Sequence, residues 1–447
     1  MKQPLLFLAV VFSLATLSED ANSQVTCLSF RVVGGNNVVI QWCPEGRDVY
    51  GGEVQRRSET GTFQTLPGSF CPSNPPPLVG CVYADVNVPG GVWYYRIRMI
   101  ALDGMSTYSD SLVVIIDISQ TDYVIITPPA YVSIMQPLAA FRTSHNSFSV
   151  KIVTTDLIYS QFGQGAPPDS AIRRFVTFAL TWWENPKPQY FLLSGNVNSI
   201  PSHKEPSIGY ADSIIVDQWF VEGVPDTASI RRPAASIGRF PAWNATQLSN
   251  MVAKTVAYES APESAWARRA IGVADAGISL GEATFFEAYA RQFMISLSPV
   301  WHDTLSVHVR PSSPHHLTRR QFFNTINEGA AITILVGRAN EYRFGVPSYF
   351  TTWDVDSLEN GLRLPFWIIK NHQRFERNDT LPTVVNLLGS NNKGGIATFA
   401  PTDLSYATSS GLFLNYVFQK MTAHPNEPIG KSILAAKRNY RDLPQYT

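Results

Sequence analysis

The spacing of hydrophobic residues changes near residue 118 and divides the chain into two parts. In residues 25–117, short runs of β-branched and aromatic residues alternate with clusters of glycine, proline and asparagine. The apolar runs cover residues 38–42, 51–57, 92–99 and 113–116. Short strands with turn signals at such regular spacing predict an antiparallel β-sandwich.

The second part, residues 118–447, alternates continuous apolar runs with segments of helical spacing. Strands are expected at 123–127, 149–153, 190–194, 270–274, 305–309, 330–336, 364–370 and 395–399. Helices are expected at 170–183, 245–258, 410–422 and 429–441, and from about residues 285 and 318. Unbroken apolar runs indicate strands buried on both faces. The alternation predicts an α/β fold with a mostly parallel, doubly wound sheet, preceded by an all-β sandwich domain over 24–117.

The first 23 residues have the pattern of a signal peptide. Lys2 gives a positive start, an apolar run covers residues 5–17, and small residues follow up to Ser23. Because the run is short for a bilayer span, cleavage is favoured over a retained anchor. No later stretch reaches the roughly 18 apolar residues of a membrane helix. We therefore expect an exported protein that is secreted, displayed on the cell surface or periplasmic, with no transmembrane segment.

All four cysteines lie in the first part of the chain, at Cys27, Cys43, Cys71 and Cys81. Four cysteines allow three pairings. Pairing of near neighbours, Cys27 with Cys43 and Cys71 with Cys81, is favoured in a domain of strands and turns. A zinc site is disfavoured because no CxxC spacing is present and export favours oxidation.

The charge balance argues against a nucleic-acid partner. Lys and Arg together number 35, as do Asp and Glu. A protein that binds a phosphate backbone carries a clear basic excess. No motif here requires a cofactor, so none is expected.

Both parts resemble known families. The Trp42 run, residues 53–56 with 61–63, and residues 89–96 resemble a fibronectin type III-like module. Over residues 120–440 the chain resembles the gingipain-like cysteine peptidases, which share the caspase-type fold. The matching segments are 122–129, 190–196, 237–241, 354–360 with 363–365, and 394–397.

The gingipain resemblance implies a His–Cys dyad, and this chain departs from it at both positions. The family's histidine lies in a Gly-His-Gly turn, where this chain reads Gly337-Arg338-Ala339. The family's cysteine lies seven residues after a proline, and counting from Pro365 gives His372. Arginine stays protonated and cannot act as a general base. No residue after Cys81 is a cysteine that could replace the thiolate.

Each candidate residue also has an ordinary interpretation. Arg338 can be a surface or ion-pairing arginine and His372 a polar residue at a strand end, or the two can form a vestigial anion-binding or peptide-binding pocket. Ser194 and Ser390 are weak substitutes for the nucleophile, because neither lies in a Gly-x-Ser-x-Gly elbow. The resemblance also allows a structural calcium at Asp212, Asp217 and Asp226, against which stands the interpretation of solvated loop acids.

Three functions follow from these observations. The first is an inactive gingipain-like homologue, a pseudoenzyme that binds or scaffolds a protein or peptide ligand. The second is an active cysteine-type endopeptidase of extracellular proteolysis, as the resemblance alone implies. The third is a propeptide-like or inhibitory partner for an active relative. The absence of cysteine after residue 81 favours the first.

Overall fold

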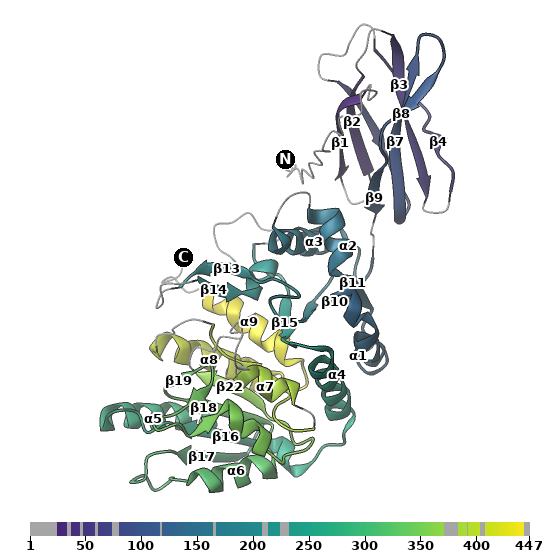
Figure 1. The fold of residues 1–447 in the computed structure, drawn as a ribbon. Helices are drawn as coiled ribbons and strands as arrows, with labels where there is room; N and C mark the ends of the chain where they lie inside the picture. The colour runs from purple at the N-terminus through teal and green to yellow at the C-terminus, as the bar shows by residue number, and fades with distance from the viewer. Residues whose placement is uncertain are drawn as a thin grey trace. The chain divides into compact units, whose positions relative to one another are not determined.

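The structure is a computed structural model, and Figure 1 shows its elements. It describes residues 25–441 except 34–36, 45–47, 59–60, 74–79, 117–118, 164–166, 208–212, 224–231, 371–382, 391 and 403–406. The predicted signal peptide lies outside the described residues. The chain forms two compact units, one made of residues up to Thr121 with Asp156–Lys187, the other of Asp122–Thr155 with the chain from Pro188.

The β-rich part of the first unit consists of two antiparallel sheets around one core. One sheet has the order β1-β2-β6, and the other has the order β4-β3-β7-β8 with β5 and β9 attached. The strands are β1 (Val25–Val33), β2 (Asn37–Pro44), β3 (Val49–Ser58), β4 (Gln64–Thr65), β5 (Cys71–Pro72), β6 (Cys81–Asp85), β7 (Gly91–Ala101), β8 (Ser106–Tyr108) and β9 (Leu112–Ile116). The inward residues of β7, including Tyr95, Ile97 and Met99, alternate with outward polar ones. The predicted sandwich is confirmed.

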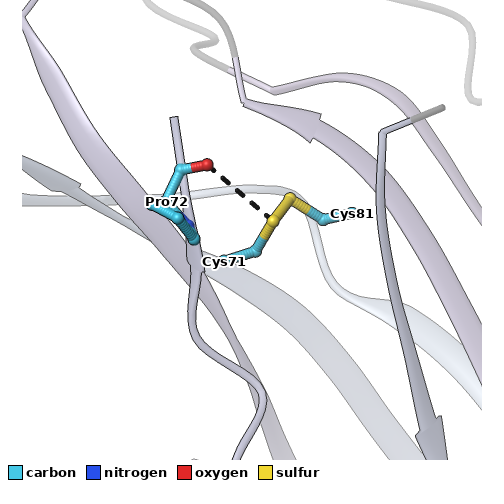
Figure 2. The surroundings of a disulfide bond; sticks show 3 residues. All are labelled: Cys71, Pro72 and Cys81. Atoms are coloured by element: carbon cyan, nitrogen blue, oxygen red, sulfur yellow. Dashed lines mark hydrogen bonds between the residues drawn. A yellow bond between two sulfur atoms is a disulfide. The ribbon is translucent and has the colours of Figure 1, made fainter. Parts of the chain in front are cut away.

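A disulfide joins Cys71 to Cys81, with the Cα atoms 6.0 Å apart, as Figure 2 shows. It links β5, which pairs with β3, to β6 of the other sheet. This bond confirms one of the two expected pairings. Cys43 is also disulfide-bonded, but its expected partner Cys27 lies outside the described side chains.

Arginine and aromatic side chains stack on the outer face of the β3–β7 sheet. The guanidinium of Arg57 lies 3.9 Å from the ring centroid of Tyr94 and 5.2 Å from that of Phe63. The guanidinium of Arg96 lies 4.0 Å from Phe63 and 3.9 Å from Tyr108. Five planar groups thus alternate in the order Tyr94, Arg57, Phe63, Arg96, Tyr108. Such cation–π contacts are stabilising even near the surface.

The helical part of the first unit is centred on one amphipathic helix. It includes η2 (Tyr159–Gly163), which follows α2 (Thr155–Ile158), and α3 (Pro168–Trp182). Helix α3 buries residues at i, i+4 and i+7 spacing, namely Ile172, Val176 and Ala179. Proline at its first position suits a helix start, because the missing N–H would have no partner there.

The second unit contains two wholly parallel sheets. The first has the order β11-β10-β12-β15 and consists of β10 (Tyr123–Thr127), β11 (Val150–Thr154), β12 (Tyr190–Ser194) and β15 (Ser236–Phe240). The second has the order β17-β16-β18-β22-β23 and consists of β16 (Arg269–Ala274), β17 (Asp303–His308), β18 (Ile332–Val336), β22 (Phe366–Lys370) and β23 (Ala397–Phe399). The predicted α/β class with parallel strands is confirmed.

Helices cover both faces of the second sheet. Alternate residues of β22 belong to different cores: Phe366 and Ile368 to one, Trp367 and Ile369 to the other. The first core includes side chains of α5 (Leu280–Leu297), α8 (Ala407–Ala423) and α9 (Ile429–Arg441), and the second includes those of α6 (Arg319–Glu328) and α7 (Thr383–Gly389). This explains why β22 is buried throughout and why its sequence is a continuous apolar run.

The second unit contains further helices and strands. They are η1 (Pro129–Tyr131), α1 (Val132–Asn146), β13 (His203–Pro206), β14 (Ser213–Val216), η3 (Asp217–Val221), α4 (Ala245–Ser260), η4 (Ala265–Arg268), β19 (Ala339–Asn340), β20 (Arg343–Phe344), β21 (Phe350–Thr351) and η5 (Thr352–Ser357). Of these, α1 and α4 share a hydrophobic core with the first sheet. None of the helices in the described ranges has the length and apolar character needed to cross a bilayer.

The buried side chain of Lys254 on α4 donates hydrogen bonds to the chain that precedes β23. The Nζ atom of Lys254 donates to the carbonyl oxygens of Leu387 at 3.0 Å, Lys393 at 2.9 Å and Gly395 at 3.2 Å. Lys254 is buried, which is rare for lysine unless its three hydrogens are satisfied. These hydrogen bonds fix the position of the residues that lead into β23, the strand next to β22.

Candidate functional site

The carboxyl ends of β16, β18 and β22 meet at one edge of the second sheet. Ala274 pairs with Val336, and Val336 pairs with Lys370, so the three strands end in register. In an open α/β sheet this edge is where ligands and reacting groups gather. The side chains that it brings together are Asp275 directly after β16, Arg338 after β18, and Lys370 at the end of β22.

Asp275 holds the turn that follows β18. Its carboxylate is fully buried and accepts two backbone N–H groups, those of Arg338 at 3.0 Å and of Val346 at 2.7 Å. Gly337 is required at this turn, because a Cβ atom there would lie 2.1 Å from the Cβ of Asp275. The position of Arg338 is therefore set by a buried carboxylate and a glycine.

The side chain of Arg338 is engaged in an ion pair. Its Nε donates to Glu282 Oε2 at 3.0 Å and its Nη2 donates to Glu282 Oε1 at 2.6 Å. Glu282 lies in the first turn of α5, which Ser279 caps, and it also accepts the N–H of Ile278. The guanidinium of Arg338 and this N–H lower the pKa of the Glu282 carboxyl group. The same pair raises the pKa of Arg338, so this arginine stays a cation.

A shallow hollow of about 240 Å³ lies beside this pair. Arg338 and Arg343 line it together with the segment from Gly345 to Ser348. Both charged residues in its lining are cations, and Arg338 is paired with Glu282. A hollow of this kind can bind anionic or carbonyl groups, but among the described residues that line it no side chain can accept a proton from a nucleophile.

The structure places only some of the site residues expected from the sequence. Arg338 lies at the predicted strand end, whereas His372, Asp212 and Asp226 lie outside the described residues. Asp217 accepts from both Nε and Nη2 of Arg239, each at 2.7 Å. No group of three or more His, Cys, Asp or Glu side chains within the described ranges is placed to hold a metal ion. The calcium site stays a prediction.

The two serines considered as substitute nucleophiles have their hydroxyls occupied. Ser194 is buried and its Oγ donates to the carbonyl of Ile126 at 3.2 Å. The Oγ of Ser390 donates to the carbonyl of Asn386 at 2.8 Å. Neither hydroxyl has a hydrogen bond to a histidine or a carboxylate in the described part of the chain, so neither is activated as a nucleophile.

Sequence reasoning missed Asp275 and Glu282. Asp275 directly follows the predicted strand 270–274, so the rule that function gathers at strand ends would have found it. Glu282 had a weaker signal, a carboxylate three residues after a serine at a helix start, which is the spacing of a capping box. The pairing of Glu282 with Arg338, 56 residues away, depends on tertiary structure alone.

Comparison with known families and structures agrees with this architecture. The sequence profile of peptidase family C25 matches residues 117–446. Comparison with curated protein sequences gives no significant match.

Solved gingipain structures share the fold at low sequence identity. The Arg-specific cysteine proteinase gingipain R superposes with a TM-score of 0.59 at 18% identity, over 72% of each chain. The complex of Porphyromonas gingivalis RgpB pro- and mature domains gives 0.58 at 17% identity, over 73% of this chain and 75% of the other. A further protease structure gives 0.57 at 13% identity, over 70% and 71%.

Proposed function

The chain belongs to peptidase family C25, and from this premise we propose that it is a member without peptidase activity that acts as an exported binding or scaffolding protein. The observation that carries the proposal is the absence of cysteine from residues 117–446, the whole region that matches the family. Peptide hydrolysis by a cysteine peptidase needs a thiolate to attack the carbonyl carbon. This region has no sulfur nucleophile of that kind.

The surroundings of Arg338 support the proposal. The resemblance assigns Arg338 to the position of the family's histidine, where a group must accept and return a proton. A guanidinium paired with Glu282 at 2.6 Å cannot do this at any physiological pH. The pair instead presents donors to a ligand, since Arg338 and Arg343 line the same hollow. Backbone carbonyls or carboxylates of a protein or peptide ligand suit these donors.

Export is part of the same proposal. The Cys71–Cys81 disulfide suits an oxidising compartment outside the cytoplasm. The signal-peptide pattern of residues 1–23 points the same way. The division into a fibronectin type III-like domain over 24–117 and a peptidase-like domain over 118–447 is also proposed. In this arrangement the β-domain presents the second domain to its ligand.

Hydrolysis of a peptide pool tests the absence of activity. The purified protein is incubated with a mixed fluorogenic peptide library, with and without iodoacetamide, beside gingipain R as the positive control. We expect no hydrolysis above that of a His372→Ala variant purified in the same way. Hydrolysis by the wild-type protein that disappears in this variant would contradict the proposal and favour an active endopeptidase.

A double variant tests whether positions 338 and 372 correspond to the histidine and the cysteine of the family's dyad. Arg338→His combined with His372→Cys should create a thiol that iodoacetamide alkylates faster than His372→Cys alone, because a nearby imidazole raises the thiolate fraction. Equal alkylation rates in the single and double variants would show that the two positions are not neighbours.

A further inference from the structure

A larger pocket, of about 400 Å³, opens at the carboxyl ends of β22 and β23. Its volume is in the range of small-molecule sites. The walls are mainly apolar and come from β14, η3, β15, β22, β23 and α8, with Ile215, Ile368, Phe399 and Leu414 among them. Figure 1 shows β22, α8 and α9 as near neighbours in this part of the fold.

One of the charged groups that line this pocket is Lys370, the last residue of β22. Its side chain is only 9% exposed, and it lies on the same face of the strand as Phe366 and Ile368. The Nζ atom is 4.7 Å from the ring centroid of Tyr289. Within the described part of the chain, no carboxylate or carbonyl accepts a hydrogen bond from Lys370. A buried ammonium in this situation is costly unless an anion joins it.

The other charged groups that line the pocket do not supply this anion. Asp217 is bound to Arg239 through both of its oxygens. Glu222 accepts a hydrogen bond from Gln218 at 2.6 Å. Lys437 adds a second cation to the lining. The pocket therefore combines apolar walls with the buried ammonium of Lys370.

We propose that this pocket binds the carboxylate of an organic acid with an apolar stem, with Lys370 as the partner of the anion. The carboxylate gives the ammonium the charge-assisted hydrogen bonds that it lacks. The apolar stem packs against the pocket walls, which removes the apolar surface of both from water. The free acid and the acidic side chain of a peptide share this chemistry. The proposal concerns binding alone, so it does not depend on whether the protein hydrolyses peptides.

Calorimetric titration of the full chain at pH 7 tests the proposal with defined probes. Hexanoate represents the free acid, and hexylamine is its oppositely charged counterpart. Acetyl-Leu-Glu-amide represents the peptide, and acetyl-Leu-Gln-amide is its uncharged counterpart. We expect one or both of the carboxylates to bind at least tenfold more tightly than its counterpart. Which one binds more tightly identifies the source. Failure of both to bind, or equal binding of hexylamine, would overturn the proposal.

Three variants assign the effect to one residue. Lys370→Met should weaken carboxylate binding by at least tenfold, while Lys370→Arg should retain part of it. Lys204→Met, at an exposed lysine on β13, is the control for a lost charge and should leave binding unchanged. If Lys437→Met abolishes binding and Lys370→Met does not, the anion partner has been misassigned and the proposal fails.

The pH dependence of the wild-type protein gives a test that needs no variant. Burial lowers the pKa of Lys370 to about 8. Because the carboxylate stays charged, its affinity should fall about tenfold between pH 7 and pH 9 as the ammonium loses its proton. Tyr289 lies against the amine, and the other titratable groups that line the pocket are Asp217, Glu222 and Lys437. A constant affinity over this range would contradict a role for Lys370.

Discussion

Replacement of Lys254 by methionine should destabilise the second unit. The substitution keeps an unbranched side chain, one atom shorter, but removes all three donors of the ammonium. Of its three acceptors, the carbonyl of Leu387 also accepts the N–H of Gly395 at 2.9 Å and stays satisfied. The carbonyls of Lys393 and Gly395 lose the hydrogen bonds that Lys254 supplies.

The size of the effect follows from these two carbonyls. A buried polar group without a partner costs about 1–3 kcal/mol. Burial lowers the pKa of Lys254 to about 7, so removing the ammonium also recovers part of its desolvation cost. We expect a net loss of about 2–4 kcal/mol, which corresponds to a melting temperature lower by about 3–6 °C for a unit of this size.

Differential scanning calorimetry measures this change directly. The transition of the second unit should move in Lys254→Met and stay in place in Lys204→Met, which removes an exposed lysine. If Lys254→Met melts at or above the wild-type temperature, the three carbonyl contacts contribute no stability. The role assigned to Lys254 would then be wrong.

Three further predictions concern other parts of the chain. Replacing Cys71 and Cys81 together by alanine should cost about 2–3 kcal/mol in the unfolding of the β-rich part, because the bond closes a loop with a sequence separation of 10; an unchanged denaturation midpoint would contradict this. Burial lowers the pKa of His308, so the fold should lose stability as pH falls below about 6.5; a His308→Gln variant should show a flatter profile of melting temperature against pH, and an identical profile would refute the assignment. Asp275→Ala should expose two backbone N–H groups to faster hydrogen exchange and lower stability by about 2–4 kcal/mol; unchanged exchange at these two amides would refute it.

The central strands of the second unit could be predicted because they are buried on both faces. The run expected at 330–336 contains β18 (Ile332–Val336), and every residue of that strand is buried. A continuous apolar run needs no knowledge of its partners to be identified as a strand. The order of strands and helices, and with it the fold class, follows from such local signals.

Elements that are only partly buried could not be identified from an apolar run in the same way. Helix α1 (Val132–Asn146) contains Pro137 and buries only Met135, Leu138 and Ala139, so its apolar stripe is weak. Strand β15 (Ser236–Phe240) has no fully buried residue and contains a glycine, so it does not form an apolar run. The local sequence of both is ambiguous, and tertiary contacts decide their structure.

The location of the candidate site could be predicted from the sequence, but the contacts between its side chains could not. The sequence located Arg338 at a strand end and showed that no cysteine follows residue 81. It did not show that Glu282 neutralises Arg338, because that contact joins a loop to a distant helix. Nor did it show that the amine of Lys370 is buried against Tyr289.

The alternating stack on the β-rich part limits which substitutions that surface can accept over evolutionary time. Arg57 lies near two rings, and so does Arg96. A guanidinium is flat and can be sandwiched between rings, whereas the ammonium of lysine is compact and has no faces to stack. An exchange of arginine for lysine at either position keeps the charge but separates the rings on its two sides. We therefore expect related sequences to vary these arginines and rings together, and seldom one at a time.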